Sequence, residues 1–379
     1  MSGKRSIFEE VGGTKTEANT PAPQAIARDD TGSRRMIGRW LFALFLLLVA
    51  MILIGGLTRL TDSGLSITEW RPLTGAIPPL SAAAWEAEFA KYREIPEFML
   101  QNSAMTLAEF KTIYWWEWGH RQLGRVIGLV WAVGFFWFLF TKAIPRGWTM
   151  RLALLGVLGG LQGAIGWWMV SSGLSGDRVD VAPYRLALHL GLAFAILACI
   201  IWFMFLIRRR EMDLFQAQRR RETPLAGPVN ILTLAVFVQI LTGALVAGLD
   251  AGRGYIDWPL MGGAFLPSEA FNEVPLWRNF FENEALTQFN HRMLAYAILG
   301  LAIWAFVKAR KSALSAIRAN FKWVLIFVAA QAVLGIVTVI NAAPLSIAIF
   351  HQLGAILLWV ILLRARFEVY YPGAQSLRS

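Results

Sequence analysis

The sequence predicts an all-α integral membrane protein whose eight transmembrane helices form two pseudo-symmetric four-helix bundles. Three observations support this fold class: an apolar composition, eight apolar stretches of spanning length, and similar motifs in the two halves. The 379 residues are 56% hydrophobic with a mean hydropathy of +0.50, which is too apolar for an ordinary soluble domain. Each apolar stretch has about 18–22 residues, enough to cross a bilayer core.

The predicted spans follow a polar, Pro- and Thr-rich tail over residues 1–36, which we expect to be disordered. No cleavable signal peptide is visible, so the first span is expected to serve as an uncleaved insertion signal. The spans are 39–60, 121–141, 152–172, 185–207, 229–249, 290–307, 322–341 and 346–364. They define an N-terminal half (37–210), a basic cytoplasmic linker (211–228), a C-terminal half (229–366) and a tail (367–379).

Basic residues gather in alternate loops, and the opposite loops hold most of the acids. This distribution follows the positive-inside rule and predicts that both termini are cytoplasmic. The net charge of +11 could suit nucleic acid, but its confinement to alternate loops argues against that partner. Membrane lipids with anionic headgroups are the expected contact of these basic loops.

The two halves share motifs that indicate an internal repeat. The segment 55–75 is similar to 243–263, so that Asp62 matches Asp250 and Trp70 matches Trp258. Four helices per half return the chain to its starting side of the membrane. The halves therefore have the same orientation, and we expect them to be related by an axis along the membrane normal.

The chain has four histidines, each near the outer end of an even-numbered span: His120, His189, His291 and His351. Histidine inside a membrane is costly and tends to be functional. Imidazole suits haem iron, and helical bundles can hold haem between two axial histidines. One turn beyond each histidine is a small residue that would leave room for a flat group: Gly124, Ala193, Ala295 and Ala355. The pairing stays open, because His120 could face His189 or His291.

Other ligand types are scarce in the sequence. The single cysteine, Cys199, allows no intrachain disulfide or thiolate cluster, and we expect it to pack as a small hydrophobic residue. Arg121, Arg125 and Arg292 lie beside or one turn beyond a histidine. These arginines could pair with haem propionates, or they could extend to the membrane interface.

The halves differ at the position three residues before the first histidine. Glu117 precedes His120, whereas the neutral Gln288 precedes His291. Residues three apart share a helix face, so only the first half places an ionisable group beside its histidine. Glu117 is therefore either a proton-transferring catalytic residue or a carboxylate that faces water at the interface.

Several motifs together resemble the haem A synthase family over residues 40–365. They are GGLTRLTDSGLSITEW (55–70), EFKTIYWWEWGHRQLGR (109–125), LALHLG (186–191), QFNHR (288–292) and the segment around His351. The resemblance implies a membrane haem-dependent oxidoreductase that oxidises the C8 methyl group of haem O to a formyl group by successive hydroxylations. The product is haem A, which terminal oxidases use.

The resemblance also implies site assignments. His120 and His189 would hold the substrate haem O, His291 and His351 a haem b cofactor, and Glu117 matches the functional glutamate. It implies a bacterial inner membrane location, with the haem sites toward the periplasm. Some members of this family carry a cysteine pair in an outer loop, which this chain lacks, so electrons would arrive through haem b from an unknown donor.

Two other functions fit parts of the sequence. A di-haem electron-transfer cytochrome would need the four histidines but not the difference between Glu117 and Gln288. A transporter could use the parallel repeat but would bind no haem. For the enzyme, candidate protein partners are haem O synthase, cytochrome oxidase assembly factors and a second copy of the chain.

Overall fold

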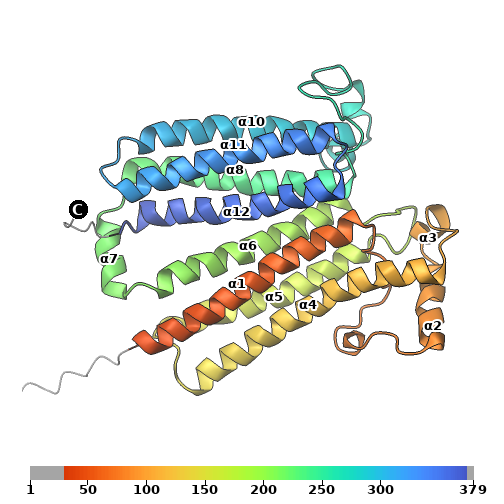
Figure 1. Ribbon diagram of the computed structural model, residues 1–379, viewed down its shortest axis with the longest axis horizontal. Coiled ribbons are helices and arrows are strands. Elements are labelled where there is room, and N and C mark those ends of the chain that lie inside the picture. The colour runs from red at the N-terminus through yellow and green to blue at the C-terminus, as the bar shows by residue number, and fades with distance from the viewer. Residues whose placement is uncertain (1–29, 374–379) are drawn as a thin grey trace, which may run out of the picture.

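The computed structural model describes residues 30–373, which fold as a bundle of long helices (Figure 1). Eight of these helices are long and apolar enough to cross a membrane, which confirms the predicted fold class. They are α1 (Thr31–Leu60), α4 (Leu107–Phe140), α5 (Thr149–Val170), α6 (Pro183–Ile207), α8 (Thr223–Gly248), α10 (Glu284–Ala309), α11 (Ser315–Ile340) and α12 (Leu345–Tyr370).

Several helices are longer than the apolar stretches that predicted them. α1 begins at Thr31, so residues 31–36 of the expected disordered tail are helical, and residues 1–29 lie outside the described chain. α12 likewise continues into the expected C-terminal tail, as far as Tyr370. Charged residues such as arginine and lysine are good helix formers, and a helix need not end where the apolar sequence ends.

α4 shows the largest difference, because it begins at Leu107 and places His120 well inside the helix rather than in its first two turns. A capping box explains the early start. The Thr106 hydroxyl accepts a hydrogen bond from Glu109 N, and the Glu109 carboxylate accepts one from Thr106 N at 2.8 Å. These bonds satisfy backbone groups that an N-terminus otherwise leaves unpaired.

The predicted basic linker, 211–228, is mostly helical. It contains α7 (Glu211–Arg219), and α8 already begins at Thr223. Arg209, just before α7, donates to the Glu368 carboxylate at 3.1 Å, near the end of α12. α7 and the end of α12 therefore lie at the same end of the molecule (Figure 1).

Each half of the chain forms its own four-helix bundle (Figure 1). In the first bundle α1 and α5 each pack against both α4 and α6, so α4 and α6 occupy opposite corners. In the second, α8 and α11 each pack against both α10 and α12, so α10 and α12 occupy opposite corners. The helices that carry the histidines therefore face each other diagonally within a bundle.

The two bundles meet through matched helices. α6 packs on α8, and α1 packs on α12, which are equivalent pairs in the repeat. The interface is apolar, with Phe194 and Leu197 fully buried, and Trp359 Nε1 donates to the Phe194 carbonyl at 3.2 Å. These contacts agree with the parallel repeat that the sequence predicts.

The outer end of this interface is joined by charges. Arg59 at the end of α1 donates to Asp250 of the second half at 2.7 Å and to Asp62 at 2.8 Å. Asp180, in the loop between α5 and α6, lies 3.6 Å from the same guanidinium group. Asp62 and Asp250 both have left-handed backbones, with φ of 47° and 49°, so the repeat extends to local conformation.

The long segment between α1 and α4 forms a small folded cap at the end opposite α7 (Figure 1). It contains η1 (Thr74–Ala76), α2 (Ala82–Tyr92) and α3 (Pro96–Leu100). Phe89 and Tyr92 of α2 pack on Phe110 of α4, with ring centroids 5.0 and 5.2 Å apart. This aromatic core fixes the cap against the outer extension of α4.

Candidate functional site

Each histidine ring lies against a glycine of the long helix that precedes it in the chain. A Cβ atom on these glycines would lie 2.8 to 3.3 Å from the nearest ring atom. The four pairs are Gly55 with His120, Gly166 with His189, Gly243 with His291, and Gly335 with His351. The absence of a side chain at these glycines therefore provides the space that the rings occupy.

The histidines come together in two pairs, one in each bundle. His120 and His189 are near enough to interact electrostatically, and so are His291 and His351. Each pair joins the diagonal helices of one bundle, α4 with α6 or α10 with α12. Of the two pairings that the sequence leaves open for His120, pairing with His189 is the one that this arrangement favours.

The surroundings of these rings fit a flat metal-bearing group. Within residues 30–373, no set of three or more His, Cys, Asp or Glu side chains is placed to hold a metal ion. Two facing imidazoles suit an iron that brings its other ligands with it, as haem does. His351 Nδ1 is buried and has no hydrogen-bond partner in the described chain. Buried polar atoms normally have a partner, so this one indicates that the ring has a function other than packing.

Glu117 is 2% exposed, so it does not face water as one interpretation of the sequence expected. Its Oε2 accepts hydrogen bonds from Ser66 Oγ at 2.8 Å and from Ile67 N at 2.7 Å. Its Oε1 accepts from Arg121 Nε at 2.9 Å. The carboxylate therefore connects α4, next to His120, with the first residues of the cap.

Arg121 and Arg125 hold the cap on α4 through backbone carbonyls. Arg121 donates to the Ile67 carbonyl at 2.8 Å and to the Glu69 carbonyl at 3.1 Å. Arg125, one turn further, donates to the Pro72 carbonyl at 2.9 Å. Both side chains extend toward the outer segment, and their contact with haem propionates stays a prediction.

Arg292 makes the matching contacts in the second half. It donates to the Tyr255 carbonyl at 2.8 Å and to the Asp257 carbonyl at 2.9 Å. Gln288 donates to the same Tyr255 carbonyl at 3.1 Å, so an amide replaces the carboxylate of the first half. Arg292 Nε and Gln288 Oε1 are buried without a hydrogen-bond partner in the described residues. These two atoms remain available to a bound polar group.

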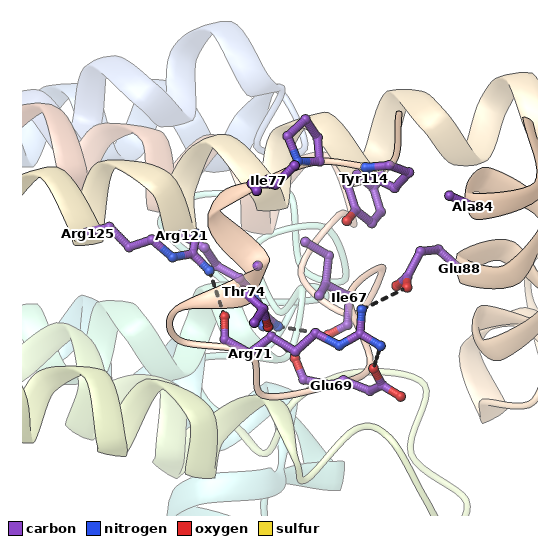
Figure 2. Close-up of a pocket in the computed structure, with 13 residues that line it drawn as sticks. Ile67, Glu69, Arg71, Thr74, Ile77, Ala84, Glu88, Tyr114, Arg121 and Arg125 are labelled. Atoms are coloured by element: carbon purple, nitrogen blue, oxygen red, sulfur yellow. Dashed lines mark hydrogen bonds and ion pairs between the residues drawn. The ribbon is translucent and has the colours of Figure 1, made fainter. Parts of the chain in front are cut away.

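A cavity of about 140 Å³ lies between the cap and α4, beside Arg121 and Arg125 (Figure 2). Arg71 spans its wall through ion pairs with Glu69 and with Glu88, the latter at 3.2 Å. Three guanidinium groups therefore surround one polar cavity at the outer end of the N-terminal bundle.

Glu97 of α3 is a second buried carboxylate, 3% exposed, and its Oε2 has no hydrogen-bond partner within residues 30–373. Burial raises its pKa to about 8, helped by the negative charges of Asp180, Glu117 and Asp62, while a hydrogen bond with Tyr92 opposes the shift. The acid is therefore protonated in the folded protein at neutral pH. Nothing in the sequence distinguishes Glu97 from the exposed acids near it, such as Glu94.

The sequence analysis also missed the glycines that lie against the histidine rings. The sequence predicted that a small residue one turn beyond each histidine, on the same helix, would leave room beside the ring. In the structure, the glycine that lies against each ring is on a neighbouring helix instead. A usable signal was present for two of them, since Gly55 and Gly243 begin the matched segments 55–75 and 243–263.

Two diagonal histidine pairs in a duplicated eight-helix bundle define a polytopic membrane protein with two histidine sites of related geometry. The family model of cytochrome oxidase assembly proteins matches residues 38–363, and the chain belongs to this family.

Curated relatives match along the whole chain. A protein named heme A synthase from Dinoroseobacter shibae is 59% identical, covering 100% of this chain and 99% of its own length. Proteins of the same name from Ruegeria sp. strain TM1040 and Paracoccus denitrificans are 56% and 54% identical, each match covering 99% of both proteins.

We expect Gly243→Ala to lower the haem content of the C-terminal bundle about tenfold, because the added methyl group would lie 3.0 Å from the His291 ring. The haem-to-protein ratio of the purified protein measures this. Gly300→Ala is the matched control on α10, where a Cβ meets no atom within 4 Å and haem content should not change. Equal haem content in both variants would contradict the glycine contact.

We expect Glu97 to make the protein less stable as pH rises. Between its ordinary pKa of 4.5 and about 8, the folded state binds a proton that the unfolded state has lost, so the free energy of unfolding falls as pH increases. Glu97→Gln should flatten the fall in Tm measured between about pH 5 and pH 8. The exposed Glu94→Gln should leave that slope unchanged, and an unchanged slope in Glu97→Gln would rule out this assignment.

Proposed function

We propose that this protein is a haem A synthase that converts haem O to haem A in the membrane. The observation that carries the proposal is the difference between two otherwise matched histidine pairs. In both pairs, each histidine ring lies against a glycine of the preceding long helix. Only His120 has a buried carboxylate, Glu117, three residues away on its helix. The whole-chain similarity to proteins named heme A synthase supports the same activity.

The N-terminal bundle would hold the substrate haem O between His120 and His189, and the C-terminal bundle would hold haem b between His291 and His351. Haem b, when bound, supplies a one-electron redox centre. The difference between Glu117 and Gln288 supports the assignment of the substrate to the N-terminal bundle. Oxidation of a methyl group requires proton transfer, and an amide cannot exchange protons at neutral pH as a carboxylate can.

Glu117 would hold or transfer a proton at its carboxylate. Arg121, 2.9 Å away, keeps a positive charge beside it, and Ser66 Oγ offers a hydroxyl that can pass a proton toward the cap. The packed aromatic rings of the cap and the outer part of α4 restrict water above this point. The chain therefore supplies a proton-exchanging group in a site shielded from bulk solvent.

The histidine ends of the helices would face the periplasm of a bacterial inner membrane, with both termini in the cytoplasm. The alternation of basic and acidic loops supports this orientation. Propionate groups would meet Arg121, Arg125 and Arg292, and the unpartnered Nε of Arg292 supports that contact for the C-terminal site. Haem O synthase, assembly factors, an electron donor and a second copy of the chain are proposed partners.

The haem composition of the purified protein tests this function. We expect an acid–acetone extract, separated by chromatography, to contain haem b together with haem O or haem A. Haem b alone at both sites would contradict the enzyme and favour a di-haem cytochrome. A protein without haem would leave only the transporter alternative.

We expect Glu117→Gln to keep both haems but to lower haem A formation at least about 100-fold, the range of a lost proton-transfer group. The fold should tolerate the amide, because Gln288 occupies the matching position in the second half and donates to the Tyr255 carbonyl in the segment after α8. Haem A per cell and haem per purified protein are the measurements. Ser66→Ala, which removes one hydrogen bond to Glu117, is the control and should have a smaller effect. Normal haem A production by Glu117→Gln would exclude a catalytic Glu117.

A further inference from the structure

Two acidic side chains are buried within residues 30–373, and both belong to the N-terminal half. Glu117 lies on α4 beside His120, and Glu97 lies on α3 in the cap. Glu117 is the proposed proton-transfer group, and Glu97 is the one other acid of residues 30–373 that is shielded from water. Acids are rarely buried without a partner, and two carboxyl groups in different environments are typical of sites that move protons. Glu97 is therefore a candidate for the same chemistry.

The two carboxyl groups differ in their hydrogen bonds. Glu117 accepts hydrogen bonds at both oxygens, from Arg121 at Oε1 and from Ser66 at Oε2. Such contacts stabilise a carboxylate that has lost its proton. Glu97 Oε2 has no hydrogen-bond partner in the described chain, and Asn102 Nδ2 lies 3.5 Å from Oε1, at the limit of a hydrogen bond. A buried oxygen without a donor suits a neutral carboxyl group that still carries its proton.

The charged and titratable groups around Glu97 come from four parts of the chain. They are Tyr92 of α2, Asp62 after α1, Asp180 before α6 and Glu117 of α4. Burial is the largest cause that raises the pKa of Glu97 to about 8, and the three acids add to it. Arg59 pairs with the two aspartates at 2.8 and 3.6 Å, and Arg121 pairs with Glu117. Neighbouring carboxyl groups titrate together, so a proton on Glu97 favours the negative charge on Glu117.

Glu97 is close to the outer surface of the cap as well as to Glu117. Met99, two residues further on α3, is 56% exposed, and α3 lies at the outer end of the molecule (Figure 1). On the inner side, the turn formed by residues 62–66 approaches both acids, because Asp62 faces Glu97 and Ser66 contacts Glu117. A proton can therefore reach Glu97 from outside water over a short distance and leave it through the Ser66 hydroxyl.

We propose that Glu97 is the proton store that reloads Glu117 during haem A formation. When Glu117 has given its proton to the reaction, the O–H bond of Glu97 breaks and an O–H bond forms at Glu117, with the Ser66 hydroxyl passing the proton. The negative charge moves to Glu97, which then takes a proton from water outside the cap. Glu97 acts only through Glu117 and does not touch the substrate. This inference rests on the proposed function, since it concerns a step of the same reaction.

Glu97→Gln tests the proposal, because the amide keeps the shape of a neutral carboxyl group but has no proton to transfer. At pH 7 and full haem content, we expect the variant to form haem A at least about tenfold more slowly, a smaller loss than at Glu117 because water can replace a distant donor. The wild-type rate should fall above about pH 8, where Glu97 loses its proton, and the variant should lack this fall. Glu97→Asp should restore part of the rate. Glu94→Gln, an exposed acid three residues earlier, is the matched control and should behave as wild type.

The infrared spectrum of the purified protein gives a readout that does not depend on activity. A protonated carboxyl group has a carbonyl stretching band that shifts in D2O. The wild type should show such a band at pH 7, and Glu97→Gln should lack it. In the wild type the band should disappear with a midpoint at about pH 8, the same midpoint as the fall in the rate of haem A formation.

A wild-type rate and pH profile in Glu97→Gln, at full haem content, would overturn the inference, as would a wild type without the infrared band at pH 7. Both results would leave the proposed function intact, because haem A would still form. A wild type that forms no haem A would instead overturn the proposed function itself. If Glu97→Gln does not fold, the two wild-type titrations decide, and different midpoints for the band and the rate would refute the proposal.

Discussion

The contact between an imidazole ring and a glycine on the preceding helix is the constraint on which the rest of this structure depends. A ring of this size fits between packed helices only where one of them has no side chain, because protein interiors have few voids. The contact occurs four times, once for each histidine, and fixes which face of each helix points into its bundle. It also sets the diagonal pairing, since the glycine helices α1, α5, α8 and α11 separate the histidine helices.

A second constraint operates at the outer ends of the bundles, where polar backbone outside the helices has to be satisfied. Arg121 and Arg292 solve it in the same way, by donating to carbonyls of the segment that follows the glycine helix, two for Arg121 and three for Arg292. In the first half Glu117 adds a carboxylate to this arrangement, and in the second half Gln288 adds an amide. Glu117, the residue to which we assign proton transfer, is thus part of a contact between a histidine helix and the segment after a glycine helix. The same contact occurs in both halves.

The sequence predicted the helices, their number and the repeat, because apolar length and matched loop motifs are local properties. It misplaced helix ends, such as the start of α4 at Leu107, because caps and polar turns extend helices beyond the membrane. It singled out the four histidines and Glu117, whose roles stay predictions, but it assigned the ring contacts to Gly124 and its equivalents on the same helices. Contacts between helices depend on how the helices pack, and the spacing of residues in the sequence does not reveal them. The same holds for the backbone carbonyls to which Arg121 donates.

The charge contacts of Arg59 make the two halves unequal partners. Arg59 binds Asp250, the equivalent of its own neighbour Asp62, but the residue of the second half that matches Arg59 is Ala247. Two N-terminal halves placed about the same axis would form this contact twice, and two C-terminal halves would not form it at all. The order of the halves in the chain therefore has a direction. The first half supplies the arginine that crosses the joint, whereas Arg253 pairs with Asp250 of its own half at 3.6 Å.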